Sequence, residues 1–196
     1  VCSSDLRHGG RKARHLPSGV KISIPNRISI DQRPVNANGR TLGDWEMDTI
    51  LGKDGKGAIV TLVERKSSFM LMEKLDTGKQ AVPLAHTVVN LLKELSVPIR
   101  TITTDNGPEF EDFADVQQWG TDVFFAHPYS SWERAVNERH NGLLRRYIPK
   151  GVSMERYTSE EVLGFADEIN SLPRKRLGYR TPEELFEDFL DSIYAA

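Results

Sequence analysis

Residues 101–110 read TITTDNGPEF, and the rest of the chain is interpreted outward from this stretch. β-Branched Thr and Ile alternate over its first half, a pattern typical of a buried strand. Asn106-Gly107-Pro108 then favours a turn, because Asn and Gly tolerate positive φ and Pro cannot continue a strand ladder. We therefore expect Asp105 at the C-terminal tip of a central strand, where open α/β sheets place their chemistry. In the alternative interpretation, Asp105 only begins an Asx-turn.

Three predicted strands precede this stretch and one follows it. Residues 43–52, 57–65 and 69–75 are apolar or alternating and are separated by short turns, which indicates an antiparallel meander. The pattern of residues 121–127 predicts the last strand. In addition, KISIPNRISI, residues 21–30, indicates a short strand or an edge contact.

Apolar residues at helical spacing predict five helices, over residues 78–95, 108–119, 130–148, 158–172 and 181–190. Three antiparallel strands followed by two strands alternating with helices predict an α/β fold. Its mixed five-stranded sheet is covered by helices, with extra helices at the C-terminal end. No GxGxxG follows the first strand and no GxxxxGK[ST] occurs anywhere, which disfavours a doubly wound nucleotide-binding fold.

The predicted helix over 130–148 has two distinct faces. Its apolar stripe consists of Trp132, Val136, Leu143 and Tyr147. The opposite face carries Arg134, Glu138, Asn141 and Arg145. We therefore expect the stripe, including Trp132, in the core, and Arg134 on the side away from it.

The charges divide the chain into two parts. Residues 1–40 hold eight Lys or Arg and two Asp or Glu, a net charge of +6, whereas residues 41–196 have a net charge of −8. The absence of sustained periodicity over 1–40 predicts a flexible basic arm, followed by a globular core over 41–196. A basic arm beside a carboxylate-rich domain fits a nucleic-acid partner and a metal site. A solvated tail beside an ordinary acidic surface is the alternative that charge alone favours.

Composition narrows the class of protein further. The 196 residues, 38% of them hydrophobic, suffice for one core of ordinary size. Cys2 is the only cysteine, which excludes an internal disulfide and a cysteine-rich zinc site and fits a reducing compartment such as the cytoplasm. No apolar run approaches the ~18–20 residues that span a bilayer, so no membrane partner is expected. The sequence begins at Val1 rather than Met, and we expect that an upstream part is missing.

Carboxylates on two predicted strands suggest a reaction centre. Alternation along the first strand places Asp48 on the face opposite Trp45. If that strand lies beside the one ending at Asp105, the two aspartates are side by side, and a helix returning over this edge brings Glu138 to them. Three crowded carboxylates raise one another's pKa unless cations hold them, and such oxygen ligands suit Mg²⁺ or Mn²⁺. Two such ions can activate the attacking oxygen and stabilise the leaving oxygen of a phosphoryl transfer.

Five segments, in this order, resemble the transposases of the IS-thirty insertion-sequence family: GDWEMDTILG, GAIVTLVERKSSF, TITTDNGPEF, FFAHPYSSWERAVNERHNGLLRRYIPKG and TPEELF. More broadly, they are similar to the DDE integrase catalytic core, which has an RNase H-like fold. The resemblance runs from about residue 24 to residue 190. Its motifs are specific as a set, because WExD, TxDNGxEF and the long segment around Glu138 occur together in order.

The resemblance implies a fold, an activity and a set of site residues. The sheet would have strand order 3-2-1-4-5, and Asp48, Asp105 and Glu138 would be both the catalytic triad and the metal ligands, with two Mg²⁺ or Mn²⁺ ions. The implied activity is nicking of DNA at element ends and 3′-hydroxyl strand transfer into target DNA. The implied assembly is a homo-oligomer on DNA in a bacterial cytoplasm, associated with the nucleoid. Family members usually carry an N-terminal helix-turn-helix region, and this sequence shows none.

Further residues are expected to contact DNA or to support the catalytic triad. The residues expected to contact DNA are Arg134, Arg145, Arg146 and Lys150. The residues expected to support the triad are Glu46, Asn106 and Asn137. Glu109 is the candidate third carboxylate if Glu138 is not the ligand. Two other functions stay open: a metal-dependent nuclease on the same fold, and an inactive DNA-binding remnant of a truncated transposase.

Overall fold

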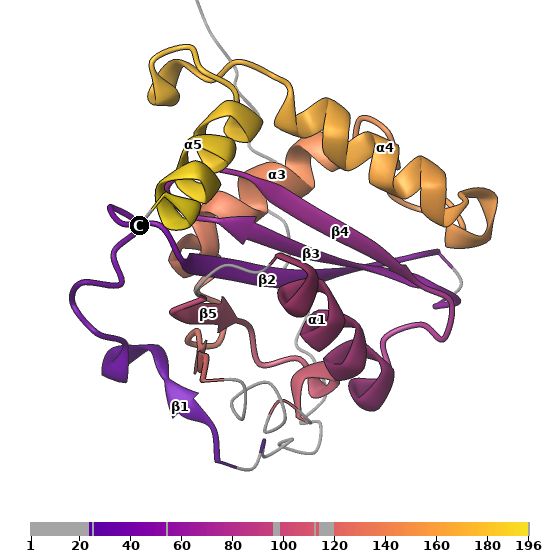
Figure 1. Ribbon diagram of the computed structural model, residues 1–196. Helices are drawn as coiled ribbons and strands as arrows, with labels where there is room; N and C mark the ends of the chain where they lie inside the picture. The colour runs from indigo at the N-terminus through magenta and orange to yellow at the C-terminus, as the bar shows by residue number, and fades with distance from the viewer. Residues whose placement is uncertain are drawn as a thin grey trace, which may run out of the picture.

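A single mixed sheet forms the centre of the protein (Figure 1). The structure is a computed structural model and describes residues 24, 26–53, 55–95, 99–111, 113 and 120–195. The strands are β1 (Ile28–Ser29), β2 (Asp44–Leu51), β3 (Ala58–Glu64), β4 (Met70–Leu75), β5 (Thr101–Thr104) and β6 (Asp122–Phe125). Their order in the sheet is β1-β6-β5-β2-β3-β4.

The predicted fold class and the order of its five strands are confirmed, and β1 adds a sixth strand at the edge. β2, β3 and β4 form the antiparallel meander, while β5 and β6 run parallel to β2. β1 lies within the sequence expected to be a flexible arm, and Ile28 pairs with Phe124 of β6. The pattern of residues 21–30 had indicated this edge contact, because its apolar residues alternate as they do in a strand.

Helices and short 3₁₀ turns cover the sheet. The helices are α1 (Ala81–Leu95), α3 (Ala135–Leu144), α4 (Ser159–Asn170) and α5 (Pro182–Tyr194). The 3₁₀ turns are η1 (Ile30–Gln32), η2 (Pro108–Phe110), η3 (Ser131–Arg134), η4 (Met154–Arg156) and η5 (Lys175–Leu177). Of the helix predicted over 108–119, the structure describes η2, and residues 112 and 114–119 lie outside the described part. No helix in the described ranges is both long and apolar enough to cross a membrane.

Local sequence explains where the last two helices begin. Thr158 and Thr181 each form a capping box, in which the threonine hydroxyl accepts from the backbone N–H three residues on and a glutamate returns the contact. Pro182 occupies the first helical position of α5, where its missing N–H has no cost. The local sequence therefore determines where both helices begin, independently of their tertiary packing.

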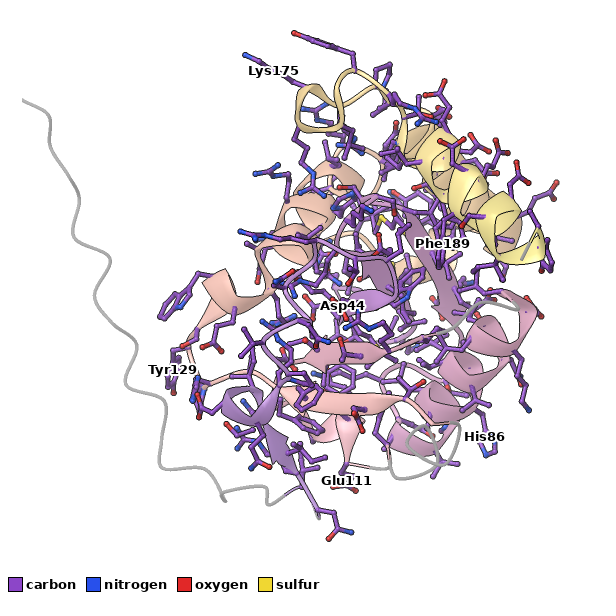
Figure 2. All side chains as sticks on the ribbon, turned by 60° about the vertical axis from the view of Figure 1, so that its left-hand side comes forward. Asp44, His86, Glu111, Tyr129, Lys175 and Phe189 are labelled. Carbon is purple, nitrogen blue, oxygen red and sulfur yellow. The ribbon has the colours of Figure 1, made fainter. Side chains whose placement is uncertain are left out.

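Two apolar clusters, one on each face of the sheet, hold the layers together. One contains Trp45 and Met47 with residues of α1 and with Phe186 of α5. The other contains Ile50 with residues of α3 and α4. Figure 2 shows Phe189, which packs against the first cluster, and His86, which lies exposed on α1. Because side chains alternate along β2, Asp48 shares the face of Ile50 and lies beneath α3.

The predicted helix over 130–148 required one correction. Residues 131–134 form the 3₁₀ turn η3, and the α-helix begins only at Ala135. A 3₁₀ turn advances about 120° per residue instead of about 100°, so the apolar stripe cannot be extended back through it. Trp132 is 71% exposed and Arg134 only 6%, which reverses the predicted positions of these two side chains. Val136, Leu143 and Tyr147 do pack against the core.

Candidate active site

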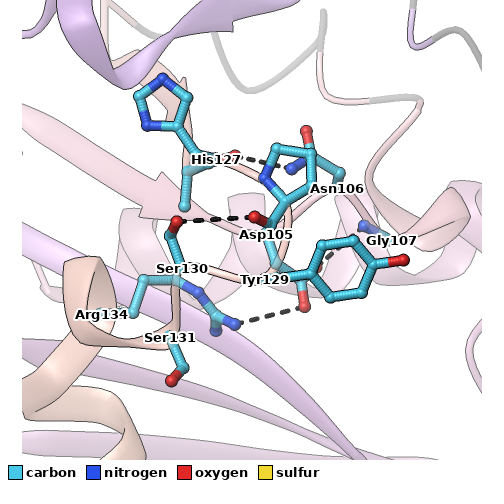
Figure 3. A pocket seen from close by; sticks show the side chains of 10 residues that line it. Asp105, Asn106, Gly107, His127, Tyr129, Ser130, Ser131 and Arg134 are labelled. Carbon is cyan, nitrogen blue, oxygen red and sulfur yellow. Dashed lines mark hydrogen bonds and ion pairs between the residues drawn. The ribbon is translucent and has the colours of Figure 1, made fainter. Parts of the chain in front are cut away.

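Asp48 and Asp105 bind the same guanidinium group, that of Arg134, and Figure 3 shows its contact with Asp105. Asp48 projects from the middle of β2 toward α3, and Asp105 directly follows the neighbouring parallel strand β5. Arg134 Nη1 lies 3.2 Å from Asp48 Oδ2, and Arg134 Nη2 lies 3.3 Å from Asp105 Oδ2. The two aspartates predicted from their strands are therefore brought together, with a cationic group between them.

The electrostatics of this site favour a cation. Burial raises the pKa of Asp48, and the charge of Asp105 raises it further, while Arg134 lowers it. Two carboxylates and one guanidinium leave a net negative charge in a partly buried place. Arg134 Nη1 also donates to Met47 O at 3.4 Å, which fixes the guanidinium against β2. Arg134 was predicted to contact phosphate from an exposed face, and in this structure its charge is directed at the aspartates.

Asn141 is a site residue for which no role was predicted. Its Nδ2 donates to Asp48 Oδ2 at 2.8 Å, while the Thr49 backbone N–H donates to Asp48 Oδ1 at 2.9 Å. Both Asp48 oxygens are thereby oriented. The available signal was spacing, since Asn137 and Asn141 lie four residues apart and therefore share one side of α3.

Glu138 does not join the two aspartates. It is exposed on α3 and makes no hydrogen bond or ion pair within the described part of the chain. Over the same residues, no group of three or more His, Cys, Asp or Glu is arranged to hold a metal ion. Glu138 nevertheless lies three residues before Asn141 on α3, so it neighbours one of the groups that contact Asp48. Its role as third ligand stays a prediction.

Glu109, the alternative third carboxylate, is already engaged. It is buried, accepts from Thr49 Oγ1 at 2.8 Å and pairs with Lys79 Nζ at 3.0 Å. A Cβ on Gly107 would lie 2.4 Å from Glu109 Oε2, so a larger residue here would displace the Glu109 carboxylate. Glu109 therefore packs beneath the turn with its charge matched by Lys79.

Glu46 and Asn137 attach the start of α3 to β2. Glu46 is 1% exposed, pairs with Arg65 Nε at 3.0 Å and accepts the Asn137 backbone N–H at 2.9 Å. Burial raises the pKa of Glu46, although these partners oppose the shift. Asn137 Nδ2 donates to Glu46 O at 3.0 Å. Both residues thus position η3, which carries Arg134, and α3, which carries Asn141, and neither forms a hydrogen bond or ion pair with an aspartate of the site.

A cavity of about 550 Å³ opens beside Asp105, with Arg134 in its wall. Asn106 Nδ2 donates to Ala126 O at 2.6 Å and ties together the ends of β5 and β6 that border it. Tyr129 lines the cavity, is 89% exposed and has φ +63°, a conformation rare for a non-glycine residue. The cavity is thus a solvent-open space next to the aspartates.

The remaining predicted DNA contacts lie along and after α3. Arg146 and Lys150 are exposed, whereas Arg145 is half-buried and donates from Nη1 to Ile148 O at 3.4 Å. Burial lowers the pKa of Arg145. Their contact with DNA stays a prediction.

His127 connects the segment before the core to the loop that precedes α3. Its Nδ1 lies 2.8 Å from Glu133 Oε1, and its Nε2 lies 3.0 Å from Asp31 Oδ2 of η1. Hydrogen bonds to Glu133 and then Asp31 raise the pKa of His127. Hydrogen bonds from Ser29 and then His127 lower the pKa of Asp31. Burial alone would raise the pKa of Glu133, but hydrogen bonds from the His127 side chain and backbone outweigh the effect of burial, so the pKa of Glu133 is lowered overall.

This contact is expected to depend on pH. The histidine contribution is complete below its ordinary pKa of 6.5 and is lost as pH rises through the raised value. The acid contributions are complete above 3.8 and 4.5 and are lost as pH falls below them. Amide protection of Ile28–Gln32 in hydrogen exchange should therefore be higher at about pH 6 than at about pH 8.5. His127→Gln should remove this difference, and His86→Gln, on the exposed side of α1, should not. Equal protection at both pH values in the parent would contradict the contact.

The mixed sheet and its covering helices have the RNase H-like architecture of integrase catalytic cores. The solved catalytic core domain of BIV integrase superposes with a TM-score of 0.55, covering 76% of this chain and 97% of that domain. At 24% sequence identity, this likeness concerns the fold alone. No protein-family model matches the chain.

Curated relatives confirm the resemblance to transposases of the IS-thirty family. The transposase for insertion sequence element IS4351 of Bacteroides fragilis is 42% identical over 95% of this chain and 58% of its own length. Transposase InsI for insertion sequence element IS30A of Escherichia coli is 36% identical over 94% of this chain and 48% of its own length. The chain thus spans about half the length of the curated relatives it matches and is a relative of insertion-sequence transposases over that span.

Proposed function

We propose that this chain is the catalytic core of a DNA transposase. It would nick DNA at the ends of a mobile element and join the freed 3′-hydroxyl to target DNA. The observation that supports this best is the pair Asp48 and Asp105, which project from adjacent parallel strands onto one cationic group beside an open cavity. The similarity to insertion-sequence transposases supports DNA as the substrate.

The donor set fits divalent metal ions in part. Asp48 and Asp105 place one oxygen each at about 3 Å from a shared cation, and carboxylate oxygens are the ligands that Mg²⁺ and Mn²⁺ prefer. These two residues would hold the ions, with Glu138 as the proposed third ligand. When bound, two such ions supply Lewis-acid activation of the attacking oxygen and charge stabilisation of the leaving oxygen.

The chain's own residues orient the ligands and neutralise charge. Asn141 and the Thr49 N–H fix the carboxylate of Asp48, so that one ligand is preorganised. Arg134 offsets part of the negative charge of the two aspartates and also lines the cavity, so the same guanidinium can pair with carboxylates or with a phosphate of bound DNA. We propose further phosphate contacts for Arg145, Arg146 and Lys150, and a homo-oligomer assembled on DNA.

The proposed reaction conserves atoms in both steps. Water attacks a phosphodiester, the bond from phosphorus to the 3′-oxygen breaks, and that oxygen leaves as a hydroxyl. The hydroxyl then attacks a target phosphodiester, and the target's own 3′-oxygen leaves. One phosphodiester is formed for each one broken in the second step, so no energy source and no covalent protein–DNA intermediate are needed.

A strand-transfer assay on oligonucleotides that carry element ends tests the proposal. We expect joined products with Mg²⁺ or Mn²⁺ and none after chelation. Nicked DNA without joined product would instead indicate a nuclease on the same fold. Duplex binding without any product under either metal would indicate an inactive remnant.

Arg134 is expected to compete with metal ions for the aspartates. Arg134→Met removes the resident cation, so the metal-free protein should lose about 3–5 kcal/mol of stability and gain metal affinity. Because bound metal stabilises the native state by RT ln(1 + [L]/Kd), the melting temperature should rise more with Mg²⁺ in this variant than in the parent. Arg145→Met is the matched control, since it removes the same charge without contacting either aspartate. Equal Mg²⁺ shifts in the two variants would contradict the competition.

A further inference from the structure

A second cavity, of about 600 Å³, lies away from the aspartates and is lined mainly by cationic residues. Its lining residues are Ser68, Arg139, His140, Pro173, Arg174, Lys175 and Arg176. None of these lining residues is acidic. Arg139 and His140 come from α3, while the basic run Arg174-Lys175-Arg176 comes from the connection between α4 and α5, where Figure 2 labels Lys175.

The cations of this cavity gather without matching carboxylates. None of the ion pairs formed among the described residues involves Arg139, Arg174, Lys175 or Arg176. Burial lowers the pKa of Arg174 and Arg176, and the positive charge of Arg139 lowers both further. Glu64 and Glu46 oppose the shift at Arg176 by smaller amounts. The folded chain therefore holds like charges together at a cost, and an anion in the cavity would relieve that cost.

Backbone contacts fix this arrangement in place. Arg174 Nη2 donates to Ile169 O at 2.9 Å, at the end of α4. Arg176 Nη2 donates to Arg65 O at 2.9 Å and its Nε donates to Ser68 Oγ at 3.1 Å, so this side chain clamps the turn between β3 and β4. The guanidinium groups are thus preorganised by neutral acceptors, which leave their positive charge uncancelled.

Two buried nitrogen atoms of the cavity residues lack hydrogen-bond partners of good geometry. His140 is 1% exposed, and its Nδ1 lies 2.7 Å from Val136 O, whereas its Nε2 is buried without such a partner in the described chain. Arg174 Nε is buried and unpartnered in the same way. Burial lowers the pKa of His140 to about 4, although the backbone of Val136 and of Ser68 opposes the shift. Unsatisfied buried polar groups are rare in folded proteins, and a bound ligand is one of the standard reasons for them.

We propose that this cavity binds a backbone phosphate of DNA, at a second contact separate from the two-aspartate site. A phosphate offers several acceptor oxygens to guanidinium groups in the geometry that Arg recognises best. The proposal rests on the proposed function only in taking DNA as the partner. α3 and the turn η3 before it carry residues of both places, because Arg134 of η3 and Asn141 of α3 contact Asp48 while Arg139 and His140 of α3 line the cavity. A phosphate held here would therefore fix the duplex against the helix that completes the proposed active site.

The test uses two exposed side chains, so that folding is preserved. Arg139→Gln with Lys175→Gln removes two cavity cations and leaves the Arg174 and Arg176 backbone contacts in place. Affinity for a short non-specific duplex would be measured without metal over a salt series. We expect at least about fivefold weaker binding, and a slope of log K against log salt reduced by about 0.9 for each phosphate that is no longer neutralised. Lys53→Gln with Arg156→Gln removes the same charge from exposed positions outside the cavity and should change affinity less than about twofold.

A second readout separates a phosphate contact from general electrostatics. An anion in the cavity should change the chemical shifts of the His140 imidazole, which NMR would detect when the duplex is added without metal. Equal affinity decreases in the cavity and control variants, or unchanged chemical shifts of the His140 imidazole on adding the duplex, would overturn the inference. Strand transfer is measured separately. If the parent forms joined products but the cavity variant binds DNA as tightly as the parent, the second contact alone is refuted. If the cavity variant binds DNA more weakly and with less salt dependence, but the parent forms no joined product, the proposed activity alone is refuted.

Discussion

Asp105→Asn is expected to abolish nicking and strand transfer, with a decrease on the order of 10³-fold or more. The amide keeps the shape of the side chain but removes one of the two negative charges that pair with the Arg134 guanidinium. Asp105 is 40% exposed and Asp48 remains paired with Arg134, so the stability of the metal-free protein should change by less than about 1 kcal/mol. Product formation in the strand-transfer assay and thermal melts with and without Mg²⁺ measure both effects.

The same substitution should remove most of the Mg²⁺-induced rise in melting temperature, because one of the two ligands already in place is removed. Asp122→Asn is the matched control, since Asp122 is exposed at the start of β6. It should leave both activity and metal response at the parent level. Parent-level joining by Asp105→Asn would mean that Asp105 begins a turn and has no part in the chemistry.

The fold was largely predictable because its elements carry strong local signals. Alternation in β2 predicted which face holds Asp48, and the Asn-Gly-Pro turn predicted where β5 ends. Both signals are local, so they can be recognised in the sequence without knowledge of the tertiary structure. The strand order came from the resemblance, since pairing between β2 and β5 joins segments far apart in the chain and no local pattern specifies it. The edge pairing of Ile28 with Phe124 is of the same kind.

The site was less predictable because it depends on side chains meeting in space. A uniform helical wheel placed Trp132 inside and Arg134 outside, and the 3₁₀ turn before α3 reversed them. Charge would also have argued against burying Arg134, because an arginine enters a protein interior only when carboxylates meet it there. Those carboxylates come from two strands distant in sequence. No role was predicted for Asn141 for the same reason, since its hydrogen-bond partner Asp48 lies 93 residues away in the sequence.

Glu138→Gln is expected to lower cleavage and joining by orders of magnitude while leaving the fold intact. The Glu138 side chain is exposed and makes no hydrogen bond or ion pair within the described residues, so the substitution removes a charge without breaking a polar interaction. Its helix propensity is nearly unchanged, and the stability of the metal-free protein should stay within about 0.5 kcal/mol of the parent. If Glu138 is a metal ligand in the active complex, its effect emerges only when metal and DNA are present. Metal-free duplex affinity should hold or rise, because one negative charge near the phosphates is removed.

Glu109→Gln supplies the contrast that identifies the third ligand. Glu109 is buried between Thr49 and Lys79, so its substitution should leave Lys79 short of a counter-charge and cost about 1–3 kcal/mol of stability. The Mg²⁺ response and the joining reaction should persist in that variant at temperatures where it is folded. A variant that folds stably but no longer joins DNA thus identifies its residue as a metal ligand. A variant that is less stable but still joins DNA identifies its residue as part of a buried ion pair. Parent-rate joining by Glu138→Gln, together with an absent metal response in Glu109→Gln, would transfer the third-ligand role to Glu109, whose Thr49 partner directly follows Asp48 along β2.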